Sequence, residues 1–226
     1  MLFKKLLILF NFYNKKKAPP ISLKINGVQY YSQWESPSLV GKIIRKEFSA
    51  QNDPFWKRSG AKSPKEYELW AKNMCGMACL KMIIKHKFGE ITPIVDLGKR
   101  CLNYGGYILK PDTIDGLYYT PFVKFVKKEF SLDAKVIRSM SIDKIIKELS
   151  LENYIIASVH HQIKRPNYKP LTKGGHLILL LGYDLEKKII LFHNPSGDTD
   201  KNQEYAKISF LQFEKFFAKR GIVIKK

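Results

Sequence analysis

The clearest periodic pattern in the chain lies between residues 75 and 89. Apolar side chains recur there at steps of three and four residues, as on one face of a helix. The positions are Cys75, Ala78, Cys79, Met82 and Ile83. Gly89 follows the last periodic residues, where glycine commonly ends a helix. The pattern predicts a helix that begins at Cys75.

A second pattern, residues 174–197, predicts a β-hairpin. Two continuous apolar runs, 176–183 and 189–194, flank a short polar turn at 184–188. Runs of this length and composition are typical of buried strands. Antiparallel pairing centred on residue 185 places His176 opposite Asn194, within cross-strand reach. His193 is one residue away and is expected on the opposite face.

The segments before Cys75 are less regular. Residues 21–31 alternate around Asn26-Gly27, a sequence that favours a hairpin turn. The polar, aromatic-rich span that follows contains turn and cap residues rather than a core helix. We therefore expect an amino-terminal extension at 1–20, and a domain at 21–226 with an insertion around 34–72.

Composition supports a folded protein. The chain has 226 residues and 45% hydrophobic content, enough to bury a sizeable core. Its three cysteines are odd in number and sparse, so a disulfide framework is not expected. A reducing, cytoplasmic location is the simpler interpretation, and it would keep a thiol free for chemistry.

The charge is strongly positive but diffuse. The net charge is +20, and the lysines are interleaved with apolar residues along the whole chain. No nucleic-acid-binding motif accompanies them, so no nucleic-acid partner is expected. The apolar run 6–10 is far shorter than a membrane span. With the lysines around it, residues 1–17 would suit peripheral contact with an anionic membrane, or packing on the body or on a partner.

Cys75 is the candidate nucleophile. At the start of a helix, backbone N–H groups and the helix dipole stabilise a thiolate, which predicts a lowered pKa for this thiol. Gly76 would leave room for a substrate backbone. The alternative is a structural cysteine buried at a helix start.

A nucleophilic thiol needs a base, an orienting group and donors for the oxyanion. Among five histidines, His176 is the candidate base, because Asn194 can hold its imidazole. Gln33 and the Cys75 backbone N–H are the candidate oxyanion donors. The alternatives are a polar cluster at a sheet edge and an ordinary loop glutamine. His86 is expected in the core, while His160 or His161 would at most line the cleft.

These motifs, in this order, resemble the papain-like cysteine peptidases of the bacteriocin-processing kind, peptidase family 39 of the cysteine class, and particularly their stand-alone relatives. The resemblance rests on Gln33, CGMA from Cys75, GGHLILLLGYD around His176, and HNPSG around Asn194. It implies an α+β papain-like fold, in which the cysteine helix packs against an antiparallel sheet carrying the histidine and the asparagine. It also implies cleavage after small residues such as Gly-Gly. Two features depart from the family: Asn194 stands where aspartate is common, and the interval between Gln33 and Cys75 is long.

Three functions stay open from the sequence. The first is a cysteine peptidase that hydrolyses a peptide or protein substrate through a Cys-His-Asn thioester mechanism, with no metal or cofactor. The second is a thiol-dependent acyltransferase. The third is a non-catalytic peptide-binding module of the same fold. Oligomeric state is not indicated.

Overall fold

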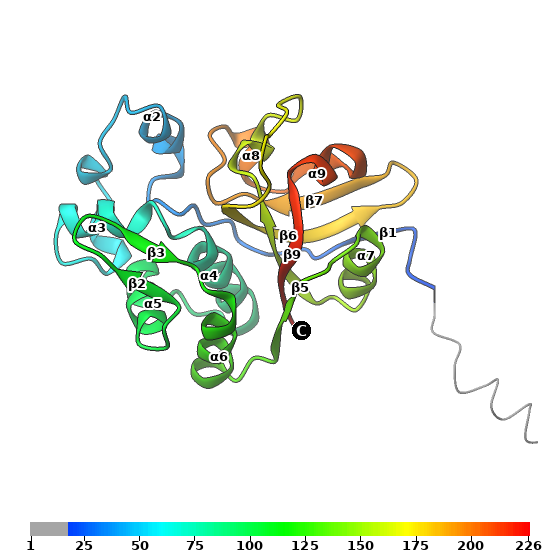
Figure 1. Ribbon diagram of the computed structural model, residues 1–226, viewed down its shortest axis with the longest axis horizontal. Coiled ribbons are helices and arrows are strands. Elements are labelled where there is room, and N and C mark those ends of the chain that lie inside the picture. The colour runs from blue at the N-terminus through cyan, green and yellow to red at the C-terminus, as the bar shows by residue number, and fades with distance from the viewer. Residues whose placement is uncertain (1–17) are drawn as a thin grey trace, which may run out of the picture.

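The computed structural model describes residues 18–226, and the expectations for residues 1–17 lie outside the described part. Helices α3 to α6 lie on one side of the molecule, and the large sheet with α7 and α9 lies on the other (Figure 1). This mixture of helices and an antiparallel sheet confirms the predicted α+β class. None of the helices in this part of the chain combines the length and the apolar character needed to cross a bilayer.

The strands form one large sheet and one small one. The large sheet has the order β4-β9-β5-β6-β7-β8, with β1 paired to β6, and every pairing is antiparallel. The small sheet pairs β2 with β3. The strands are β1 (Ser22–Lys24), β2 (Tyr107–Leu109), β3 (Ile114–Gly116), β4 (Ala134–Ile137), β5 (Tyr154–Val159), β6 (His176–Asp184), β7 (Ile189–His193), β8 (Ala206–Ser209) and β9 (Phe217–Ile224).

Helices connect the strands and cover the sheet. The α-helices are α2 (Val40–Ile44), α3 (Pro64–Ala71), α4 (Cys75–Phe88), α5 (Ile94–Leu102), α6 (Tyr119–Phe130), α7 (Ile142–Ser150), α8 (Asp200–Gln203) and α9 (Phe210–Phe216). Residues 18–226 also contain four short 3-10 turns: η1 (Pro37–Leu39), η2 (Ala50–Asn52), η3 (Trp56–Ser59) and η4 (His161–Lys164).

Helix α4 has the predicted bounds. It begins at Cys75, and Gly89 ends it in a left-handed conformation with φ of 73°, which glycine adopts without steric cost. Residues 76–84 are all buried, so this part of the helix is surrounded by the rest of the protein and has no solvent-exposed face. It packs against β6, where the Cys79 Sγ lies 3.9 Å from the carbonyl oxygen of Leu177.

The hairpin β6–β7 is present, but its predicted register is wrong. Leu180 pairs with Phe192, and an irregularity separates this pair from those nearer the turn. Continuing the register places Ser196, not Asn194, opposite His176. Asn194 still lies on the same face, as a diagonal neighbour, because side chains two residues apart share a face. His193 pairs with Leu179 on the other face, as predicted.

The predicted hairpin at Asn26-Gly27 is also wrong. Strand β1 pairs with the far end of β6, where Ser22 lies opposite Asp184, and no strand follows the turn. Gly27 adopts a φ of 75°, so the local turn geometry is there. The preceding segment pairs with β6 because that strand offers hydrogen-bonding groups already fixed by the core.

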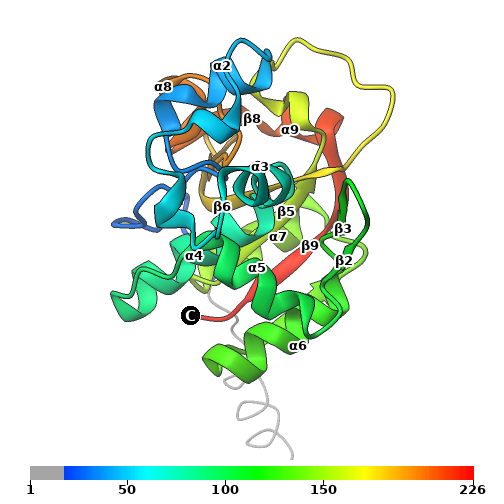
Figure 2. The ribbon, with the colours of Figure 1, turned by 90° about the vertical axis from the view of Figure 1, so that its left-hand side faces the viewer.

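Residues 34–72 hold a small apolar cluster of their own. Its buried members are Trp34, Val40, Ala50, Tyr67 and Ala71. The segment also contacts α8, where the Gln203 side chain donates a 2.9 Å hydrogen bond to the carbonyl of Pro37. Figure 2 shows α2 beside α8.

Asp53 ties this segment together. It is fully buried, and its carboxylate accepts hydrogen bonds from the Ser36 hydroxyl at 2.5 Å, the Phe55 N–H at 3.0 Å and the Tyr67 hydroxyl at 2.7 Å. The Ser36 N–H donates a further bond at 3.1 Å. One carboxylate thus joins three separate stretches of the segment.

We predict that Asp53→Ala lowers the free energy of unfolding by about 2–4 kcal/mol, because several buried donors would lose their shared acceptor. Chemical denaturation measures the change. Asp112→Ala removes an exposed carboxylate and is the matched control, expected within about 0.5 kcal/mol of wild type. Equal stability of the two variants would contradict the role given to Asp53.

Candidate active site

Cys75 occupies the first position of α4. Its side chain is partly exposed, whereas Cys79 and Cys101 are buried. Within the described chain its backbone N–H donates to no backbone carbonyl, as expected in the first turn of a helix. Of the three thiols, Cys75 alone lines the pocket described below.

The electrostatic setting of this thiol differs from the prediction. Desolvation raises the pKa of Cys75 to about 11, although the backbone N–H groups of Leu177 and Gly76 act in the lowering direction. The predicted lowering by the helix start is therefore outweighed by burial. At neutral pH the resting side chain is a thiol, and a base must take its proton during attack.

Gly76 has a different role from the one predicted. A Cβ at this position would lie 2.6 Å from Leu117 Cδ2 and 2.9 Å from Leu177 Cδ1. The space above Gly76 is therefore filled by these two side chains rather than left for a substrate. Glycine here allows the start of α4 to press against β6 and the segment after β3.

His176 and Asn194 meet as predicted, by the diagonal contact across the hairpin. The His176 Nε2 lies 2.8 Å from Asn194 Oδ1 and 3.0 Å from Ser196 Oγ. The Ser196 N–H also donates to Asn194 Oδ1 at 3.2 Å, which identifies that atom as the oxygen. An acceptor at this position requires Nε2 to carry the imidazole proton, leaving Nδ1 as the acceptor nitrogen.

His176 is uncharged at neutral pH, the form in which an imidazole can accept a proton. Burial lowers the pKa of His176 to about 4, although the hydrogen bond to Asn194 acts in the raising direction. The imidazole is therefore neutral at neutral pH. A neutral imidazole with a free Nδ1 can accept a proton from a thiol.

Aromatic side chains support Asn194 from behind. The Tyr30 hydroxyl donates a 2.9 Å hydrogen bond to the Asn194 carbonyl. The neighbouring His193 is fully buried between Tyr30 and Tyr205, with ring centroids 5.7 and 4.5 Å away and both contacts edge-to-face. Neither ring nitrogen of His193 has a hydrogen-bond partner within the described residues.

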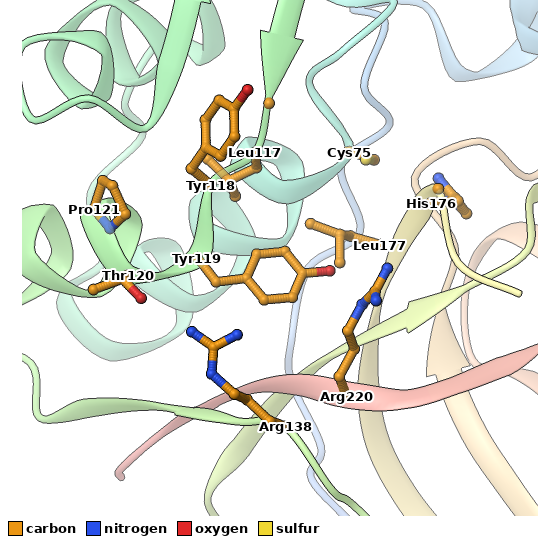
Figure 3. Close-up of a pocket in the computed structure, with 12 residues that line it drawn as sticks. Cys75, Leu117, Tyr118, Tyr119, Thr120, Pro121, Arg138, His176, Leu177 and Arg220 are labelled. Atoms are coloured by element: carbon orange, nitrogen blue, oxygen red, sulfur yellow. The ribbon is translucent and has the colours of Figure 1, made fainter.

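Cys75 and His176 line one pocket of about 470 Å³. Figure 3 shows them on the same side of it, Cys75 from α4 and His176 from β6. The segment after β3 forms another wall, with Leu117, Tyr118 and Tyr119. The remaining lining residues include Arg138, Gly175, Leu177 and Arg220.

Gln33 lies near the site but makes other contacts. Its side-chain nitrogen donates to the carbonyls of Ala71 at 2.9 Å and Lys72 at 3.3 Å. Its backbone N–H donates to the carbonyl of Pro195 at 3.0 Å. Gln33 therefore links the turn before Cys75 to the turn after Asn194, and it is not among the residues that line the pocket. Its role as an oxyanion donor stays a prediction.

The other histidines do not line this pocket. His86 lies 2.6 Å from the Tyr154 hydroxyl through Nδ1 and packs edge-to-face on that ring, but it is half-buried rather than in the core as expected. His160 accepts from the Gln162 N–H at 3.2 Å and stacks on Tyr168.

Sequence reasoning missed Ser196 and the two arginines. Ser196 follows Asn194 by two residues and shares its contact with His176, so the NPS sequence was a usable signal. Arg138 and Arg220 had no signal, because only the pairing of β4 with β9 brings positions so distant in the chain together.

Comparison with known proteins places this chain in a family. The chain matches the Peptidase_C39 like family over residues 25–223, and it belongs to that family. A solved structure of a Bacillus anthracis protein, assigned as a C39-like peptidase, shares the fold with a TM-score of 0.50 and 16% identity, over 68% of this chain and 88% of the other. Comparison with curated proteins gives no match. The resemblance to peptidase family 39 drawn from the motifs is thus confirmed, while its bacteriocin-processing character stays a prediction.

We predict that His193 makes the fold sensitive to acid. Burial lowers the pKa of His193 to about 3, with Lys24 adding a smaller effect. The unfolded chain takes up this proton below about pH 6.5 while the folded chain does not, so stability falls as pH falls from there. Between pH 7.5 and 5, His193→Phe should lose about 2 kcal/mol less unfolding free energy than wild type.

Denaturant titration at both pH values measures this difference. Burial lowers the pKa of His161 as well, but by less, so His161→Phe is the control and should recover only a small part of this difference. A His193→Phe variant with the same pH dependence as wild type would refute the assignment.

Proposed function

We propose that the protein is a cysteine peptidase that hydrolyses a peptide bond with Cys75 as nucleophile, His176 as base and Asn194 as orienting group. The observation that carries the proposal is the 2.8 Å contact of His176 Nε2 with Asn194 Oδ1. This contact leaves Nδ1 free to accept the proton of Cys75, which lines the same pocket as His176. Membership in the Peptidase_C39 like family supports the same chemistry.

The first half of the reaction forms a thioester. His176 Nδ1 takes the Cys75 proton as the sulfur attacks the substrate carbonyl carbon, giving a tetrahedral oxyanion. The Cys75 backbone N–H, which donates to no backbone carbonyl of the described residues, is the donor available to that oxygen. The carbon–nitrogen bond then breaks, and the imidazolium gives its proton to the leaving amine.

The second half regenerates the thiol. His176 takes a proton from water, which attacks the thioester carbon. The carbon–sulfur bond breaks, the acid leaves, and the sulfur recovers its proton from the imidazolium. The neutral resting pair is consistent with this cycle, because the proton returns to the thiol at its end.

Cleavage of a mixed peptide library, followed by mass spectrometry, tests the proposal. We expect Cys75→Ala to abolish cleavage and His176→Ala to reduce it by roughly 10²–10⁴-fold. Asn194→Ala should give a smaller loss, since it removes only the orientation of the imidazole. Cys101→Ala, at a buried thiol outside the pocket, is the matched control and should cleave like wild type.

Three results would contradict the proposal. Activity that survives Cys75→Ala would exclude a thioester mechanism. Products joined to an added amine, in place of free acids, would identify the acyltransferase instead. A wild-type protein that cleaves nothing and binds peptides without change would support the binding module.

The pH dependence gives an independent test. The lowered pKa of His176, about 4, keeps the base neutral through mildly acidic conditions, and the raised pKa of Cys75, about 11, keeps the thiol protonated at neutral pH. We therefore expect kcat/KM to fall only near pH 4 on the acid side, and to stay level up to about pH 9. An acid limb near pH 6.5 would show that His176 titrates as an ordinary histidine.

A further inference from the structure

Two arginines line the pocket on the side away from α4. Arg138 follows β4, and Arg220 lies on β9. Figure 3 shows the Arg220 guanidinium directed toward the side of the pocket where His176 lies, and that of Arg138 directed toward Tyr119. The pocket thus has two cationic groups and the candidate nucleophile in one space.

Neither arginine has an acidic partner in the described part of the chain. No aspartate or glutamate is among the residues that line the pocket. The ion pairs of the described residues include other basic side chains, such as Arg45, Arg100 and Arg165, but neither of these two. Both side chains are exposed and free to meet a ligand.

The strand register places the two arginines at facing positions. Ile137 on β4 pairs with Gly221 on β9, and continuing the antiparallel register by one residue places Arg138 opposite Arg220. The segments that contain these arginines remain hydrogen-bonded beyond this point, where the Met140 N–H donates to the Lys219 carbonyl at 2.8 Å. Like charges directly opposite each other on neighbouring strands repel. An anion bound between them would remove that repulsion.

Gly174, two residues before His176, leaves space for the Arg220 side chain. A Cβ at Gly174 would lie 3.1 Å from a guanidinium nitrogen of Arg220. Arg220 therefore reaches over the chain that leads into His176. A group held by this guanidinium would lie next to the reacting carbonyl.

We propose that the pocket recognises a carboxylate on the substrate, close to the bond that is cleaved. Guanidinium groups match a carboxylate through paired N–H donors, and two of them in a partly enclosed pocket favour a charged group over a neutral one. The carboxylate belongs to an aspartate or glutamate side chain, or to the carboxyl terminus of the peptide. That the carboxylate belongs to a substrate of the reaction rests on the proposed function. The presence of an anion site is tested independently of it.

The first experiment compares alkylation of Cys75 by iodoacetate and by iodoacetamide, which differ in charge. The reaction is followed at pH 8 by mass mapping of the three cysteine peptides. The quantity compared is the iodoacetate rate divided by the iodoacetamide rate. Any change in the reactivity of the thiol itself affects both rates and cancels in this ratio. Arg138→Gln/Arg220→Gln should lower this ratio by roughly 3- to 10-fold, the effect expected of two partly exposed charges.

Two further variants control the result. Lys128→Gln/Lys215→Gln removes two exposed charges from α6 and α9, outside the pocket, and should leave the ratio unchanged. Arg138→Lys/Arg220→Lys keeps the charges and should retain most of the ratio. It also guards against a glutamine variant that fails to fold. An unchanged ratio in the folded glutamine variant, or an equal fall in the α6 and α9 variant, would overturn the proposal.

The peptide library then identifies the source of the carboxylate. Enrichment of aspartate or glutamate near the cleavage sites, lost in Arg138→Gln/Arg220→Gln, would assign a side chain. Cleavage near the carboxyl terminus that stops when the peptides are amidated would assign the terminal carboxylate. Cleavage with neither preference would overturn the substrate proposal while leaving the peptidase intact. A shifted alkylation ratio without cleavage would uphold the anion site and refute the peptidase.

Discussion

The contact of the first turn of α4 with the start of β6 determines the geometry of the site. Gly76 is the point of closest approach, since any side chain there would meet Leu117 and Leu177. One turn further on, Cys79 lies against the Leu177 carbonyl. This packing fixes Cys75 on one element and His176 on the other, at neighbouring ends. The same packing explains why the thiol is desolvated, so the contact that positions the nucleophile also raises its pKa.

Local patterns predicted the parts of the site that lie within single elements. The helix from Cys75 and the strands that start at His176 and end before Asn194 all follow from apolar periodicity and from Gly89. The meeting of His176 with Asn194 was predicted for an incorrect reason, because the turn is not centred where the pattern placed it. Near the turn Asp184 pairs with Ile189, a register that would carry Gly197 opposite His176 and place Asn194 on the other face. The one-residue irregularity between Leu180 and Gly182 shifts the register back, so that Ser196 lies opposite His176 and Asn194 is its diagonal neighbour on the same face.

Properties that depend on burial or on distant pairing could not be predicted. The direction of the Cys75 pKa is set by how much of α4 the rest of the chain covers, which no local pattern contains. Arg138 and Arg220 meet only through β4 and β9. The contacts of Gln33 with Ala71 and Lys72 depend on how residues 34–72 fold back before Cys75. That segment is organised by its own buried carboxylate, Asp53.

Strand β1 fixes the place on the large sheet from which the amino-terminal residues leave. Ser22 pairs with Asp184, eight residues along β6 from His176, which corresponds to about 26 Å of extended strand. A surface or protein that bound residues 1–17 would therefore be attached at the end of β6 opposite the thiol. The thiol would then lie about the length of that strand away from the point of attachment.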